Sequence, residues 1–265
     1  EGFKLIAQNY DLFYIDLWGV IHNGIKLHDD AILVLNQITK IKKEFVLLTN
    51  APRPIHTVKK ILKKMGMEEE LTNHVFTSGE ASLSYLKKKF SKNFFFHVGP
   101  LRDFDLFHDF KDYKSNKIED CEYLLCTGLF DEHDKDLNYY KDLLEKHIEK
   151  KMICTNPDLI VDRGDRRDMC AGSVAMVFEK MGGKVVYFGK PYPEVYNQAA
   201  NKKNKKVLSI GDNLNTDIKG ANLLNYDSLL ISNGVHKEEI KNQGIDVVSK
   251  QYESIVNYMQ SDLKW

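Results

Sequence analysis

Carboxylate side chains directly follow two apolar stretches that lie far apart in the chain. Asp16 ends LFYID, Asp212 follows KVLSIG, and Asp217 stands five residues further on. If the apolar stretches are parallel strands, their carboxyl ends lie at one edge of a sheet, where ligands of such sheets bind. A carboxylate placed there can attack a phosphorus atom and form an acyl phosphate. Several carboxylates beside a phosphoryl group require a hard cation, and Mg²⁺ suits them because it prefers oxygen ligands.

Two further stretches place complementary groups at the ends of apolar runs. Thr49 and Asn50 follow FVLL, and Lys190 lies in GKP just after KVVYF. A threonine hydroxyl and loop amides can donate hydrogen bonds to phosphate oxygens, while a lysine supplies a compact positive charge. Each signal alone is weak, because such residues after a strand more often form caps and turns. The set becomes specific because every member follows a predicted strand.

Short apolar runs alternate with longer segments that have helical periodicity. Each run is apolar on both faces and bounded by turn residues, which is typical of strands inside a parallel sheet. The alternation predicts an α/β fold, a doubly wound parallel sheet with helices on both faces. The predicted strands are 12–15, 45–48, 184–188, 206–210 and 228–231, and the predicted helices lie within 28–43, 53–67 and 191–204.

The middle of the chain predicts a second α/β unit inserted into the first. Strand-like segments at 93–100, 121–129 and 151–157 alternate there with helical patterns at 134–151 and 172–183. A pair of glycines closes the last helical pattern, as is common at the end of a helix. We therefore expect a core domain formed by 1–77 and 185–265, and an inserted domain at 78–184.

The 265-residue chain has balanced charge. Lys+Arg and Asp+Glu each total 38, so no net charge draws the protein to nucleic acid or acidic membranes. The basic runs at 87–89 and 201–206 are expected to be solvated surface. No stretch approaches the roughly 18–20 apolar residues that span a bilayer, and EGFKLIAQNYD has no secretory pattern. Because the four cysteines lack CxxC spacing, we expect reduced, mostly buried thiols and a cytoplasmic location without nucleic-acid or membrane partners.

The motifs together resemble the haloacid dehalogenase (HAD) superfamily. The closest likeness is to its class with a large α/β cap inserted after the second motif, the branch of p-nitrophenylphosphatase-like and nucleotide phosphatases. The matching stretches are DLWGVIHNG, LLTNAPRP, NPDLIVDRG with AGSVAMVFEKMGGKVVYFGKPYPEVY, and SIGDNLNTDIKGAN, and they extend over 11–222. The resemblance implies a HAD-like core with an inserted cap and a hydrolase acting on a small phosphorylated metabolite. Related capped phosphatases often dimerise, so the resemblance also suggests a homodimer as one assembly to test.

The resemblance implies roles for the residues at the strand ends. Asp16 would be the nucleophile and a Mg²⁺ ligand, with the Trp18 backbone carbonyl and the Asp212 carboxylate as further ligands. Lys190 would neutralise the transferring phosphoryl group and steady Asp16. Asp217 would support the metal-bound water or Lys190, and Asn213 would lie beside the ligands.

The same resemblance implies a substrate side of the site. Thr49 and Asn50 would hold the phosphoryl group, and Gly19 would let the loop turn after the nucleophile. Segments 156–158, beginning with Asn156, and 171–173 would reach the cleft from the cap. Four nearby residues could contact the leaving group of the substrate: Asp162, Arg163, Arg166 and Arg167. For the three arginines, the alternative is that they are ordinary surface charges.

One position departs from the family pattern. Phosphatases of this superfamily carry a second Asp two residues after the nucleophile, where this chain has Trp18. That Asp protonates the leaving oxygen and then activates water, whereas an indole N–H only donates and does not titrate in this range. General acid–base help contributes about 10²–10⁴-fold to rate. We expect Trp18 to pack under the cap or to stack on an aromatic ligand, and His22 is the nearest replacement acid by sequence.

Three hypotheses follow from this departure. The first is a slow Mg²⁺-dependent phosphatase or phosphotransferase that works through an aspartyl-phosphate, on esters whose leaving groups need no protonation. The second is a catalytically impaired regulatory protein that binds a phosphorylated metabolite. The third is carbon–phosphorus or carbon–halogen cleavage, which is disfavoured because the cap type matches phosphatases and no cap lysine is placed to form an imine.

Overall fold

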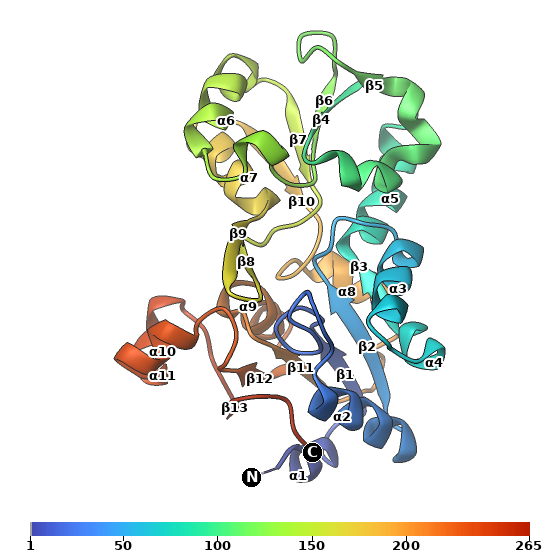
Figure 1. The fold of residues 1–265 in the computed structure, drawn as a ribbon, viewed down its shortest axis with the longest axis vertical. Coiled ribbons are helices and arrows are strands. Elements are labelled where there is room, and N and C mark those ends of the chain that lie inside the picture. Colours follow the sequence, from blue (N-terminus) through green and yellow to red (C-terminus); the bar gives the residue numbers. More distant parts are fainter. Residues whose placement is uncertain (1) are drawn as a thin grey trace.

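The structure contains two parallel β-sheets, which lie one above the other along the long axis of the molecule (Figure 1). The computed structural model describes residues 2–265 (Figure 1). The chain passes from the first sheet into the second and then returns to the first. The α/β fold class with a doubly wound parallel core sheet is confirmed.

The first sheet has six strands, all parallel, and carries the predicted strand ends. Its central strand pairs on both sides: Leu12 of β1 lies opposite Val207 of β11 and Glu44 of β2. All three neighbours therefore end at one edge. In spatial order the strands are β13 (Tyr258–Gln260), β12 (Asp227–Ile231), β11 (Val207–Gly211), β1 (Leu12–Ile15), β2 (Glu44–Thr49) and β3 (Val75–Thr77).

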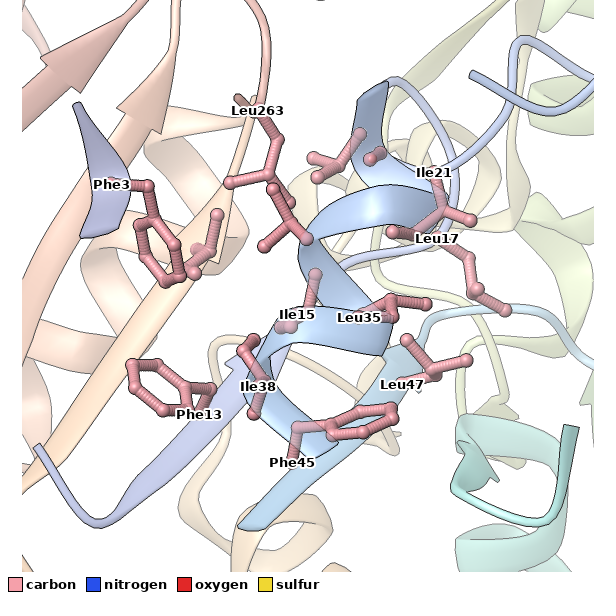
Figure 2. Packing of buried hydrophobic residues seen from close by; sticks show 14 of the residues in the cluster. Phe3, Phe13, Ile15, Leu17, Ile21, Leu35, Ile38, Phe45, Leu47 and Leu263 are labelled. Atoms are coloured by element: carbon pink, nitrogen blue, oxygen red, sulfur yellow. The ribbon is translucent and has the colours of Figure 1, made fainter. Parts of the chain in front are cut away.

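Helices cover this sheet because they present apolar residues at helical spacing. In α2 (Asp29–Lys40) the buried positions Ala31, Val34, Leu35 and Ile38 share one face, which packs on the sheet (Figure 2). Two aspartates in its first turn and a lysine in its last complement the helix dipole. The other helices of this unit are α1 (Phe3–Ala7), α3 (Ile55–Lys64), α4 (Glu69–Thr72), α8 (Pro193–Ala199), α9 (Lys219–Leu223), α10 (Lys237–Gln243), α11 (Ile245–Gln251) and the π-helical turn η4 (Leu214–Ile218).

The second sheet has five parallel strands and forms the inserted unit. Its order is β10 (Lys184–Tyr187), β7 (Lys151–Cys154), β6 (Tyr123–Cys126), β4 (Phe95–Val98) and β5 (Lys114–Ser115). The helices around it are α5 (Ser78–Lys89), α6 (Leu137–Leu144), α7 (Ala171–Lys180) and the 3₁₀ segments η1 (Leu101–Tyr113), η2 (Asp131–His133) and η3 (Glu145–His147).

The predicted strand at 184–188 exists but belongs to the other sheet, so its assignment to the core was wrong. Lys184 of β10 pairs with Lys151 of β7, and Phe188 continues this pairing through a hydrogen bond to the Cys154 carbonyl. A short, apolar run has the same pattern at either location, and only the pairing partner distinguishes them. The chain returns to the first sheet after Phe188, not at 185. The two-domain division remains a prediction, and we refer to 78–188 as the inserted unit.

Two further differences concern the inserted unit. The helix expected within 134–151 is shorter, because α6 ends at Leu144 and tightens into the 3₁₀ turn η3. An antiparallel hairpin, formed by β8 (Ile160–Arg163) and β9 (Arg166–Met169), was not predicted. Its strands are rich in charge and only four residues long, so they lack the apolar alternation that identifies strands. Figure 1 shows this hairpin reaching from the inserted unit toward the first sheet.

One apolar cluster joins the two units. Leu12 and Tyr14 of the first sheet and Phe95 and Tyr123 of the second belong to the same buried cluster, together with Phe188. Helix α5 contributes Ala81 and Leu86 to it. The inserted unit is therefore fixed to the core by shared packing in addition to its two chain connections.

Among the described residues, no helix has the length and apolar character required to cross a bilayer. Lys87, Lys88 and Lys89 are exposed, as expected for surface charge. All four cysteines are buried and free.

The α2 face provides a matched test of the core. Leu35 is fully buried and Leu33 is half exposed on the same helix. We expect Leu35→Ala to lower the free energy of unfolding by about 2–5 kcal/mol, because it leaves a cavity. Leu33→Ala should change it by less than about 0.5 kcal/mol. Urea unfolding followed by circular dichroism measures both, and equal losses would contradict the described packing.

Candidate active site

Three buried carboxylates meet at the carboxyl edge of the first sheet. Asp16 follows β1, and its backbone N–H donates to the Ile210 carbonyl of β11 at 2.8 Å, which extends the pairing of these strands. The same strand β11 leads to Asp212. One carboxylate oxygen from each of Asp16, Asp212 and Asp217 lies within 4.8 Å of the other two. The expected convergence of these side chains is thus present in the structure.

Lys190 lies between two of these carboxylates. Its ammonium Nζ donates to Asp16 Oδ1 at 2.5 Å and to Asp217 Oδ1 at 2.7 Å, and all three side chains are buried. The lysine comes from the segment that returns from β10, and therefore not from a strand end of the first sheet. A buried ammonium held by two carboxylates is stable only when both partners are in place.

Asn50 fixes the backbone that carries this lysine. The Lys190 N–H donates to Asn50 Oδ1 at 2.7 Å, and Asn50 Nδ2 donates to the Lys190 carbonyl at 3.1 Å. Asn50 Nδ2 also donates to Asp158 Oδ1 at 3.1 Å. A Cβ on Gly189 would lie 2.6 Å from Asn50 Oδ1, so only glycine permits this approach. The Asn50 amide thus already serves Lys190 and Asp158, while the Thr49 hydroxyl accepts one N–H, from Ala51.

Hydrogen bonding separates the three carboxylates by role. Asp217 uses both oxygens, one for Lys190 and one for the Asn213 N–H at 3.2 Å. Asp212 Oδ2 accepts the Val235 N–H at 3.0 Å. Within residues 2–265, Asp16 Oδ2 and Asp212 Oδ1 have no hydrogen-bond partner, and both residues line the cleft. Two carboxylates therefore keep one oxygen each for a ligand.

The charges of the site are unbalanced without a ligand. Burial raises the pKa of the Asp16 carboxyl to about 8, although the Lys190 ammonium opposes part of the shift. Burial likewise raises the pKa of Asp158 to about 6 and that of Asp212 well above its ordinary value, where Asp16 adds repulsion. Burial alone would lower the pKa of Lys190, but Asp16 and Asp217 outweigh it and raise the pKa. Lys190 thus contacts two carboxylates directly, while Asp158 and Asp212 add further negative charge to the site.

This donor set fits a hard divalent cation. The available groups are carboxylate oxygens, with no sulfur or imidazole among the three clustered side chains. A cation held by Asp16 and Asp212 would offset the excess negative charge. Asn213, beside them, accepts the Asn215 N–H at 2.9 Å and so shapes the turn that carries Asp217.

The Trp18 side chain packs beneath the hairpin. Its indole N–H donates to the Asp162 carbonyl at 2.5 Å, and its ring meets the His22 ring edge-on at a centroid distance of 5.1 Å. Burial lowers the pKa of His22 to about 4, and its Nδ1 accepts the Gly24 N–H at 3.0 Å. A neutral imidazole in this tautomer has no readily donated proton at neutral pH, so His22 is poorly suited to replace the missing acid.

A cleft of about 470 Å³ lies between the sheet edge, the inserted unit and the hairpin. This volume suits a small ligand. Among the residues expected there, Pro157, Asp162, Arg167 and 171–173 do not line it. The Asp162 carbonyl instead accepts the Trp18 indole N–H, and the Ser173 hydroxyl donates to the Leu159 carbonyl at 2.7 Å. The cleft is lined by the expected residues Asp16, Trp18, Thr49, Asn50, Asn156, Asp158, Arg163, Arg166, Lys190, Asp212, Asn213 and Asp217.

Several cleft residues were not predicted from the sequence. Arg53 of the first unit forms an ion pair with Asp103 of the inserted unit at 3.3 Å, and Arg102 pairs with Asp131. All four line the cleft. Arg53 lies in the LLTNAPRP stretch, and its position after a strand could have indicated a role in the site. The other three residues lie in the 3₁₀ segments η1 and η2, which carry no recognisable motif.

The comparisons with known proteins identify the family. A family model described as haloacid dehalogenase-like hydrolase matches residues 13–110, and a second, described as HAD-hydrolase-like, matches residues 187–254. A crystal structure of a hydrolase of the haloacid dehalogenase-like family from Brucella suis 1330 is 31% identical, with a TM-score of 0.81 over 89% of this chain and 90% of that one. The chain therefore belongs to the haloacid dehalogenase-like hydrolase family.

More distant structures share the fold. A possible sugar phosphatase of the HAD superfamily from Cytophaga hutchinsonii is 18% identical, with a TM-score of 0.77 over 100% of this chain and 98% of that one. A 4-nitrophenylphosphatase from Thermotoga maritima is 23% identical, with a TM-score of 0.70 over 97% and 96%. No curated protein sequence matches the chain.

Gly19 tests how closely the loop is fitted to Asp212. Gly19 and Gly66 both have positive φ, but a Cβ on Gly19 would lie 2.1 Å from Asp212 Oδ2, whereas Gly66 has open space. Gly66→Ala should therefore lower the free energy of unfolding by only the backbone strain, about 1–2 kcal/mol. Gly19→Ala must also displace a buried carboxylate, and we expect a clearly larger loss in urea unfolding. Similar losses for both variants would refute the close fit at Asp212.

Proposed function

We infer that the protein is a Mg²⁺-dependent phosphatase that acts on a small phosphorylated metabolite through an aspartyl-phosphate at Asp16. The observation that carries this inference is the Asp16–Lys190–Asp217 arrangement beside Asp212, at the base of a cleft of suitable size. The family membership and the phosphatase names of more distant structures add support.

The reaction would begin with attack of the Asp16 carboxylate on phosphorus. The new bond joins Asp16 to phosphorus, and the bond from phosphorus to the leaving oxygen breaks with its electron pair on that oxygen. Lys190 keeps Asp16 oriented through its contact with Oδ1. Water then attacks the phosphorus of the acyl phosphate, releasing inorganic phosphate and restoring the carboxylate.

The Asp16 and Asp212 carboxylates, with the Trp18 backbone carbonyl, would hold the Mg²⁺. When bound, the ion would neutralise charge on the phosphoryl oxygens and on the crowded carboxylates. Thr49 would donate its hydroxyl to the phosphoryl group. Asn50 would contribute mainly by holding Lys190, because its amide is already hydrogen-bonded.

This set of residues lacks a group that can protonate the leaving oxygen. Trp18 stands where a carboxyl group would protonate the leaving oxygen, and its N–H is bonded to Asp162. The proposed activity is therefore slow on alkyl esters and greater on aryl or acyl phosphates, whose leaving groups depart without a proton. The same observation favours the second candidate function, a metabolite-binding regulatory protein without turnover.

The Asp16 nucleophile can be tested with p-nitrophenyl phosphate and Mg²⁺. We expect measurable turnover in the wild type, which falls to background in Asp16→Asn because an amide is a poor nucleophile. Chelation by EDTA should abolish turnover and added Mg²⁺ should restore it. Asp120→Asn, at an exposed position outside the cleft, serves as the control and should keep wild-type turnover. A wild type as silent as Asp16→Asn over a panel of phosphate esters would favour the regulatory function.

The missing acid can be tested with Trp18→Asp. A carboxyl group at this position should raise kcat on alkyl esters about tenfold or more, below the roughly 10²–10⁴-fold of an evolved acid–base group. KM should rise as well, because the contacts of the indole with the hairpin are lost. Steady-state kinetics on alkyl and aryl phosphates measures both constants. If the folded variant gains no kcat on alkyl esters, the absent acid is not what limits turnover.

A further inference from the structure

The hairpin places Arg163 over the indole face of Trp18. The guanidinium carbon lies 5.3 Å from the centroid of the Trp18 ring, within the range of a cation–π contact. The Trp18 N–H holds the adjacent Asp162 carbonyl, so the strand that carries Arg163 is tied to the core beside it. Both Trp18 and Arg163 line the cleft that contains Asp16.

Two further contacts fix the position of the hairpin. Its turn is tied to the core loop by the Gly164 N–H, which donates to the Asn23 carbonyl at 3.2 Å. A Cβ on Gly24 would lie 2.5 Å from Trp18 Cζ2 and 3.3 Å from Arg163 Cγ, so the absence of a side chain there lets all three residues fit together. Arg167 holds the opposite strand through the Val235 carbonyl at 3.0 Å.

Arg163 is a cleft arginine that leaves most of its hydrogen-bonding capacity unused, and it is more exposed than Arg53, which is likewise bound only through Nε. Arg163 makes no hydrogen bond within residues 2–265, and its nearest carboxylate contact is Nε to Asp168 Oδ2 at 3.5 Å. Asp168 is bound more closely by Arg166, which also pairs with Asp134. The remaining arginines of the cleft, Arg53 and Arg102, have their own aspartates. The Nη groups of Arg163 are therefore left for a ligand.

The chemistry of these nitrogens defines the ligand. A guanidinium presents paired donors, keeps its charge at any physiological pH, and matches a carboxylate or a phosphate. Lys190 and the carboxylates would bind the transferred phosphoryl group, and Arg163, which lines the same cleft, is available to the rest of the substrate.

We propose that Arg163 determines specificity by binding an anionic substituent on the leaving group, and that Trp18 is a positioning residue that holds Arg163 in place. The substrate is then a phosphate ester whose leaving group carries a carboxylate or a second phosphate. This proposal rests on the proposed phosphate chemistry at Asp16. Where the family pattern has an aspartate, this chain thus has a tryptophan whose ring supports the Arg163 guanidinium of the hairpin.

Binding of matched, non-hydrolysable ligands tests the proposal without turnover. Benzylphosphonate and 3-carboxybenzylphosphonate differ only by a carboxylate, and isothermal titration calorimetry in Mg²⁺ gives Kd for each. We expect the wild type to bind the carboxylated ligand about tenfold more tightly, as for a charge-assisted hydrogen bond at a half-exposed site. Arg163→Gln should reduce the ratio of the two Kd values to about one.

Variants of Trp18 separate positioning from general structure. Trp18→Phe keeps an aromatic face and should retain part of the preference, whereas Trp18→Leu should lose most of it although Arg163 is present. Arg102→Gln, at a cleft arginine already paired with Asp131, is the matched control and should keep the wild-type ratio. Thermal unfolding midpoints verify that each variant is folded.

Each outcome decides between the alternatives. Equal affinities of the wild type for both phosphonates, or a wild-type ratio in Arg163→Gln, would overturn the assignment of Arg163. A ratio that survives Trp18→Leu but not Arg163→Gln would refute the positioning role alone. Failure of the proposed phosphatase function would show differently, as absent turnover on p-nitrophenyl phosphate while the binding preference persists.

Discussion

The buried contact of Lys190 with Asp16 and Asp217 is the interaction on which the rest of the site depends. It joins three segments: the end of β1, the turn after β11 and the chain returning from the inserted unit. An ammonium removed from water needs both carboxylates, and each carboxylate needs the ammonium. The supporting contacts, from Asn50 to the lysine backbone and from the Asn213 N–H to Asp217, keep this geometry fixed before any ligand binds. Such pre-organisation is what electrostatic catalysis of phosphoryl transfer requires.

Much of the core and the acidic centre could be predicted from the sequence, because both depend on local patterns. The strands β1, β2, β11 and β12 are short apolar runs, and the carboxylates follow them directly. The parallel arrangement then brings Asp16 and Asp212 together without further information. The assignment of β10 to the wrong sheet had a physical cause: an apolar run does not specify its partner, and only the register with β7 does. Lys190 was nevertheless placed in the site, because its motif depends on the returning segment and not on which sheet precedes it.

The cap side of the cleft was harder to predict because its residues act through tertiary contacts. The hairpin strands are charged and lack apolar alternation, and the pairing of Arg53 with Asp103 joins two units that are distant in sequence. Asn50 was also difficult to predict. Its position after a strand suggests a residue that binds phosphate, whereas its observed hydrogen bonds join it to Lys190 and Asp158. For Trp18, the sequence left open packing under the cap or stacking on a ligand. The structure shows an indole packed against the hairpin and bonded to it.

The apolar cluster shared by the two sheets has a consequence for how substrate enters. Rotating the inserted unit as a rigid body would expose the apolar faces around Leu12, Tyr14, Phe95 and Tyr123 to water, which is strongly unfavourable. The hairpin, by contrast, is held at the core by a few polar contacts and one cation–π contact. Displacing the hairpin would therefore disturb less buried apolar surface than rotating the inserted unit.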